Sequence, residues 1–187
     1  MPPRQRLILD SNAYFRLALS IHPLLEHSFG PYQLAVIQEL DEEFDRSPRL
    51  QNKFDWVAGK EHIADREKRV IKPGKNRVEI DRAYSYFRNA PELTRNNTSQ
   101  VDIRVLAVCH VLGHIAVTDD QGMIAAAALF DVPVKTTLEL LDLMLKNNRS
   151  PVSQAKIREI AEYWRYTSDL PANYQADFIR LFGPPVP

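Results

Sequence analysis

Short runs of aliphatic residues recur along this chain, and they predict the strands of a sheet. Residues 7–9, 34–37 and 114–117 are almost continuously apolar. Such runs are typical of strands that are buried on both faces, as in a parallel sheet. Residues 131–134 predict a fourth strand. It should lie at the edge of the sheet, because Pro133 has no N–H to donate to a neighbouring strand.

Between these runs the apolar residues follow helical spacing. Ser99 with Asp102 and Thr136 with Glu139 resemble capping boxes at two helix starts. The pattern also indicates two helices around the loop at 73–76 and two amphipathic helices in the C-terminal tail. The main predicted helices span 13–21, a segment from about 39, 99–112, 121–130 and 136–145.

The order of strands and helices predicts an α/β fold. Because crossovers between parallel strands are right-handed, we expect a three-layer α/β/α arrangement with a central, mainly parallel sheet. The main domain is expected over residues 1–148, with a basic helical insertion at about 46–98. Residues 149–187 are expected to form a helical C-terminal extension.

Charge is balanced over the whole chain but not along it. The sequence has 24 Lys and Arg against 24 Asp and Glu, whereas residues 46–104 hold 14 against 8. This local excess points to an anionic partner, although a charge run is also typical of a solvated helix face.

Cysteine content and hydropathy indicate the compartment. The single cysteine, Cys109, excludes an intramolecular disulfide and fits a reducing environment. We find no signal peptide, and the longest uncharged apolar run, residues 123–130, is too short to span a bilayer. We therefore expect a cytoplasmic protein without membrane contact.

Acidic residues lie where several predicted strands end or helices begin. Asp10 ends the first strand and Asp120 follows the third. Glu39 follows the second strand, and Asp102 begins the helix that leads into the third. In a parallel sheet these positions share one edge, where open α/β sheets bind ligands. Each acid has a simpler explanation as a residue that stabilises a helix start.

Four carboxylates at one edge would repel one another unless a cation joined them. Hard oxygen ligands with no His or Cys nearby suit Mg²⁺ or Mn²⁺. Such a site fits hydrolysis of a phosphodiester, because the metal makes hydroxide available and offsets charge in the transition state.

The same blocks of sequence resemble the signature blocks of the PIN domain family, and they occur in that family's order. The resemblance rests on residues 7–12, 36–40, 101–107 and 117–120, with 131–134 similar to the family's last strand. PIN domains are mostly Mg²⁺/Mn²⁺-dependent ribonucleases, and many are VapC-type toxins of toxin–antitoxin pairs. The resemblance implies catalytic metal ligands at Asp10, Glu39, Asp102 and Asp120.

Three further positions follow from this resemblance. Asn12 and Thr118 match the family's polar residues near the first and last acids. Asp119 would contact the metal ligands without binding the metal itself. The chain departs from compact toxins in its longer 46–98 segment and in its C-terminal tail. These departures put the toxin role in more doubt than the nuclease role.

We therefore predict an endoribonuclease that hydrolyses RNA and leaves a 5′-phosphate and a 3′-hydroxyl, the product polarity being implied by the family. An antitoxin partner and a homodimer stay open. Candidate RNA contacts are Arg66, Lys68, Arg69, Lys72, Lys75, Arg77 and Arg82.

Two alternatives remain at this point. One is a non-catalytic RNA-binding or assembly protein on the same fold. The other is an α/β phosphotransfer protein with Asp10 as phosphoacceptor and Lys135 after the fourth strand. The blocks around Glu39 and Asp102 argue against the second alternative.

Overall fold

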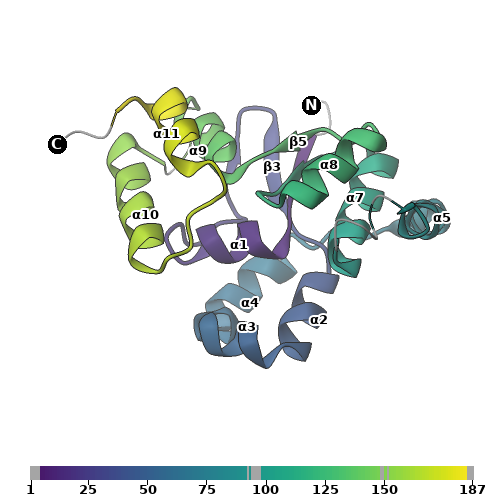
Figure 1. Ribbon diagram of the computed structural model, residues 1–187. Helices are drawn as coiled ribbons and strands as arrows, with labels where there is room; N and C mark the ends of the chain where they lie inside the picture. Colours follow the sequence, from purple (N-terminus) through teal and green to yellow (C-terminus); the bar gives the residue numbers. More distant parts are fainter. Residues whose placement is uncertain (1–4, 92, 94–97, 148–149, 151, 185–187) are drawn as a thin grey trace.

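A five-stranded sheet in the order β2-β3-β1-β4-β5 organises the protein (Figure 1). The structure is a computed structural model, and it describes residues 5–91, 93, 98–147, 150 and 152–184. The strands are β1 (Gln5–Leu9), β2 (Ser28–Phe29), β3 (Tyr32–Ala35), β4 (Ile115–Val117) and β5 (Val134–Lys135).

The sheet is mainly parallel, as the aliphatic runs predict. β1 pairs in parallel with β3 and β4, and β5 pairs in parallel with β4. β5 lies at the edge, which confirms the position expected from Pro133. β2 pairs antiparallel with β3 at the other edge, and the sequence pattern did not predict this two-residue strand. The α/β class is therefore confirmed.

Both faces of β1 are buried, and successive residues feed two different cores. Leu7 and Leu9 belong to one cluster of buried side chains, while Ile8 between them belongs to the other. This division follows from the two-residue period of a strand. Helices supply the rest of each cluster, so an uninterrupted apolar run is the pattern that this strand requires.

The first cluster is covered by helices from both ends of the chain. It receives side chains from α1 (Ser11–Ala18), α2 (Glu39–Arg46), α9 (Thr137–Leu145), α10 (Gln154–Tyr166) and α11 (Tyr174–Phe182). Trp164 of α10 is buried, and its Nε1 donates to the carbonyl of Arg16 in α1 at 2.9 Å. The tail expected as an extension thus packs on the same core as β1. The expected boundary at 148–149 lies outside the described residues.

The second cluster lies under α5 (Arg77–Arg88), α7 (Gln100–Leu112) and α8 (Gln121–Leu129). α5 runs alongside α7 at one side of the molecule (Figure 1). Phe87 of α5 stacks on Phe130 with 3.7 Å between the ring centroids. These contacts fix α5 against the body of the protein.

The rest of the insertion is also helical. The sequence predicted two helices around the loop at 73–76, but the structure divides the segment before this loop into several short helical elements. The rest of the insertion contains α3 (Pro48–Lys53), the 3₁₀ turn η1 (Asp55–Ala58), α4 (Lys60–Glu67) and the 3₁₀ turn η2 (Gly74–Asn76). After α4 the chain returns to the sheet, where Ile71 donates its N–H to the carbonyl of Val36 at 2.8 Å. No helix in the described part of the chain is long and apolar enough to cross a membrane.

Arg66 holds α4 against α1 and α2. Its guanidinium donates to Asp41 at 2.7 Å, to the Tyr14 hydroxyl at 3.2 Å and to the carbonyl of Val57 at 3.1 Å. Only 3% of the residue is exposed. Arg66 is therefore a structural residue, and its predicted role as an RNA contact is wrong because a buried and fully engaged guanidinium cannot reach a phosphate.

Arg66→Ala should lower the free energy of unfolding by about 3 kcal/mol, because it removes a buried guanidinium and leaves Asp41, the Tyr14 hydroxyl and the Val57 carbonyl without their donor. Urea unfolding followed by circular dichroism measures this loss. Arg82→Ala is the matched control, since Arg82 is exposed and pairs with none of the described residues; it should change stability by less than about 0.5 kcal/mol. Equal losses in the two variants would contradict a structural role for Arg66.

Candidate functional site

Asp10 lies at the carboxyl end of the central strand β1 and is also the N-cap of α1. Its Oδ1 accepts a hydrogen bond from the backbone N–H of Ala13 at 2.6 Å. The residue is 1% exposed, and its Oδ2 is buried with no hydrogen-bond partner among the described residues. One carboxylate oxygen therefore orients the side chain. The other has the Thr118 hydroxyl in its surroundings but accepts no hydrogen bond of normal geometry from a described residue.

Burial is the main reason that the pKa of Asp10 rises from 3.8 to about 7. The charges of Asp102 and Asp119 raise this pKa further, whereas Thr118 and the Ala13 amide lower it. A buried carboxylate with carboxylate neighbours and an unpartnered oxygen is costly in its charged form. A proton or a cation would relieve that cost.

Asp102 begins α7 and forms the predicted capping box with Ser99. The Asp102 N–H donates to Ser99 Oγ at 3.1 Å, and the Ser99 N–H donates to Asp102 Oδ2 at 3.2 Å. Burial raises the pKa of Asp102 to about 6, against the lowering effect of Ser99. The charges of Glu43 and Asp120 also raise this pKa.

Asp120 follows β4 and is the N-cap of α8. Its Oδ1 accepts from the N–H of Met123 at 2.7 Å, and its own N–H donates to Thr118 Oγ1 at 3.0 Å. Asp10, Asp102 and Asp120 thus all stabilise helix starts, as the simpler explanation holds. They also lie at one edge of the sheet, as the sequence predicts. The charge of Asp102 raises the pKa of Asp10, and the charge of Asp120 raises the pKa of Asp102.

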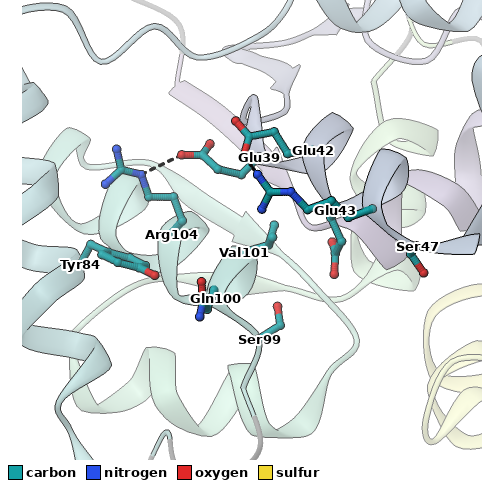
Figure 2. Close-up of a pocket in the computed structure, with 10 residues that line it drawn as sticks. Glu39, Glu42, Glu43, Ser47, Tyr84, Ser99, Gln100, Val101 and Arg104 are labelled. Atoms are coloured by element: carbon teal, nitrogen blue, oxygen red, sulfur yellow. Dashed lines mark hydrogen bonds and ion pairs between the residues drawn. The ribbon is translucent and has the colours of Figure 1, made fainter.

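Glu39 is the acid that does not join this group. Its Oε1 accepts from Arg104 Nε at 3.0 Å, and Arg104 also pairs with Asp81 at 2.7 Å. Figure 2 shows the Glu39 carboxylate directed toward Arg104. Glu39 therefore has an arginine partner, contrary to the expectation, whereas Asp10, Asp102 and Asp120 have no ion pair to a described residue.

Glu43 takes the position near Asp102 that the sequence assigned to Glu39. It lies one helical turn after Glu39 in α2, and it accepts a hydrogen bond from the Ser11 hydroxyl next to Asp10. The sequence reasoning missed Glu43 and Ser11 as members of the site. The available signal was the spacing of four residues between Glu39 and Glu43, which places both on one helix face.

The residues predicted to support the metal ligands have different surroundings. Thr118 is buried and holds the N–H of Asp120. Asp119 pairs with Arg16 and accepts from the Thr137 N–H at 3.0 Å and the Thr137 hydroxyl at 2.6 Å, which ties the loop after β4 to α1 and α9. Asn12 is exposed and contacts none of the described residues through a side-chain hydrogen bond.

The remaining basic candidates fall into two groups. Lys68 pairs with Glu26, and Arg69 donates to the carbonyl of Leu25 at 3.2 Å. The exposed candidates without an ion pair to a described residue are Lys72, Lys75, Arg77 and Arg82.

The acids are neighbours but do not form a closed ligand set. Within the described ranges, no group of three or more His, Cys, Asp or Glu side chains is placed to hold a metal ion. Comparisons with family models, with curated proteins and with solved structures give no match to this chain.

Asp10→Asn should stabilise the metal-free protein at neutral and alkaline pH. Asparagine keeps the cap acceptor for the Ala13 N–H and removes the buried charge. Because the pKa of Asp10 is raised from 3.8 to about 7, the folded protein binds a proton more tightly than the unfolded chain. Wild-type stability should therefore fall as pH rises from about 4 through about 7, by an amount on the order of 4 kcal/mol.

Thermal melts in EDTA at pH 4 and pH 8 measure this difference. The advantage of Asp10→Asn should be small at pH 4 and largest at pH 8. Asp45→Asn is the matched control, because Asp45 is exposed and its carboxylate contacts none of the described residues. A lower melting temperature for Asp10→Asn than for wild type at pH 8 would contradict the buried-charge argument.

Proposed function

We propose that this protein is a metal-dependent endoribonuclease with the three-layer α/β/α arrangement of a PIN-like domain. The observation that carries the proposal is the buried Asp10 oxygen that has no hydrogen-bond partner among the described residues. The charge of Asp102 acts on Asp10, and the charges of Glu43 and Asp120 act on Asp102. This group of acids at the carboxyl edge of a parallel sheet supports a cation site where α/β folds bind ligands. The resemblance of the sequence blocks to PIN domains supports RNA as the substrate.

The residues present fit Mg²⁺ or Mn²⁺. Asp10 and Asp102 would hold the ion, with Asp120 and Glu43 close by. The lack of a closed group of three ligands in the described residues is compatible with Mg²⁺, which keeps several waters and commonly takes one or two protein carboxylates plus substrate phosphate. Imidazole and thiolate ligands, which zinc favours, do not contribute to this set.

A bound divalent ion supplies an acidified water as the nucleophile and offsets negative charge on the phosphodiester. The chain's own residues prepare the site. The cap from Ala13 fixes the Asp10 carboxylate, and the capping box fixes Asp102. The Ser11 hydroxyl holds the Glu43 carboxylate by a hydrogen bond. The N-termini of α1, α7 and α8 at the same edge favour negative charge there.

The exposed basic residues would bind the RNA backbone outside this centre. Lys72, Lys75, Arg77 and Arg82 are the candidates that the described contacts leave available. Their interaction with phosphates would depend on salt through counterion release. A toxin role with an antitoxin partner, and a homodimer, rest on the resemblance to VapC-type proteins alone.

A non-catalytic RNA-binding protein on the same fold is the second candidate. The observation that favours it is the pairing of Glu39 with Arg104, because the family resemblance assigns Glu39 to the metal. A PIN-like site that has lost one ligand would bind RNA without cleaving it. The cleavage experiment decides between the two candidates.

Wild-type protein should cleave single-stranded RNA with Mn²⁺ and lose that activity in EDTA. Asp10→Asn should lower the rate by more than about 100-fold, because the loss of a direct ligand exceeds the roughly 10- to 100-fold cost of a supporting residue. Denaturing gels of a labelled RNA measure this rate. Cleavage that persists in EDTA or in Asp10→Asn would overturn the proposed function, and an inactive wild type with intact RNA binding would favour the second candidate.

We call Asp10, Asp102, Asp120 and Glu43 the acidic centre. Glu43→Gln and Glu39→Gln test which of the two glutamates contributes to it. Both changes remove one charge from the same face of α2. We expect Glu43→Gln to lower kcat by about 10- to 100-fold, the usual cost of a residue that supports a metal site, and Glu39→Gln to change kcat by less. The reverse order would show that Arg104 releases Glu39 in the active state and that the family's ligand set holds.

A further inference from the structure

A cavity adjoins the acidic centre and extends away from it between α2, α7 and α5. Its volume is about 470 Å³, within the range of small-molecule binding sites. Glu43 and Ser99 line it. Ser99 forms the capping box with Asp102, and Glu43 accepts a hydrogen bond from Ser11, the residue after Asp10. Figure 2 shows the side chains that surround this cavity.

Two planar side chains, those of Tyr84 and Arg104, form one wall of the cavity. The Arg104 guanidinium lies 5.6 Å from the centre of the Tyr84 ring. Its Nε donates to Glu39 and its second nitrogen donates to Asp81, so the guanidinium is held in place from both sides. Planar groups of this kind are the surfaces on which unpaired bases stack.

Hydrogen-bonding groups without partners lie beside this wall. Among the described residues, none hydrogen-bonds to the Gln100 amide or to the Tyr84 hydroxyl, and the two groups lie toward the same part of the cavity (Figure 2). Glu39 and Glu43 add carboxylate oxygens. The lining therefore offers carboxylate acceptors, together with a hydroxyl and an amide that can each donate or accept.

A phosphate does not suit this cavity. Glu39 and Asp81 hold Arg104, and Arg46 pairs with Glu42 at the surface at 3.1 Å. The three glutamates of the lining outnumber its two arginines. The unpaired groups are neutral or negative. A flat, neutral ligand edged with N–H donors fits the lining better than an anion does.

We propose that this cavity binds one unpaired base of the RNA substrate, stacked on the Tyr84–Arg104 wall and read by Gln100 and the glutamates. Because the lining is rich in acceptors, it should favour bases with an exocyclic amino group over uracil. The position of that base next to the cleaved phosphate rests on the proposed function. The binding of a base does not.

Fluorescence anisotropy of the full-length Asp10→Asn protein in EDTA tests the cavity without cleavage. The probes are fluorescein-labelled oligoadenylate, oligocytidylate and oligouridylate. We expect oligoadenylate and oligocytidylate to bind more tightly than oligouridylate. Adding Tyr84→Ala should weaken binding of the preferred probes by about 5- to 100-fold, the usual effect of losing one stacking side chain.

Two further variants separate base recognition from folding. Gln100→Ala changes an exposed residue at the start of α7 and should reduce the difference between oligoadenylate and oligouridylate. Tyr86→Ala is the matched control, because Tyr86 lies two residues after Tyr84 in α5 and is 72% exposed. It should change binding by less than about twofold, as expected for a residue outside the contact. Thermal melts confirm that each variant folds.

The outcomes distinguish this proposal from the nuclease proposal. Suppose that the wild type never cleaves RNA but binds the probes with a base preference, and that Tyr84→Ala removes this preference. This result would support base binding in the cavity and overturn the nuclease proposal. Cleavage with unchanged base preference in Tyr84→Ala and Gln100→Ala would support the nuclease and overturn the cavity. Failure of all three probes to bind would also overturn the proposal that the cavity binds a base. That result is the one expected if the cavity binds a protein partner instead.

Discussion

A parallel sheet brings the ends of its strands and the starts of its helices to one edge, and the acidic centre depends on this constraint. Asp10 and Asp120 each follow a strand and cap the next helix, while Asp102 lies in the first turn of the helix that leads back to β4. In each case one carboxylate oxygen is used by the local cap. The geometry of crossover connections thus turns three ordinary capping residues into one group of mutually repelling charges.

Arginines decide which acids remain in that group. Arg104 takes Glu39 and Arg16 takes Asp119, and both pairs are largely shielded from solvent. Arg16 also donates to the carbonyl of Asp169, so the C-terminal helices are joined to the loop that carries Asp120. The pKa of Asp10 and that of Asp102 are raised because these two acids are buried without such a partner.

The sequence pattern predicted those parts of the fold in which local and tertiary requirements agree. Buried strands, the capping box at Ser99 and the edge position of β5 each follow from a few neighbouring residues. The pattern failed where the answer depends on distant partners. Nothing near Arg66 indicates that Asp41 and Tyr14 surround it, and nothing near Glu39 indicates that Arg104 lies 3.0 Å away. Glu39 was predicted from its place after the second strand and from the family resemblance, whereas the four-residue spacing also puts Glu43 on that helix face.

Ser99 and Glu43 make the acidic centre and the neighbouring cavity a single unit. Ser99 fixes the Asp102 carboxylate through its backbone and side chain and also lines the cavity, and Glu43 contacts both Ser11 and the cavity. A ligand that displaces either side chain must change the charge balance around Asp102. Arg104 lines the cavity and also donates a hydrogen bond to Glu39. A base stacked on Arg104 would therefore also affect the position of Glu39. Substrate binding in the cavity and cation binding at the acids would then be linked through shared side chains, a coupling that requires no movement of the sheet.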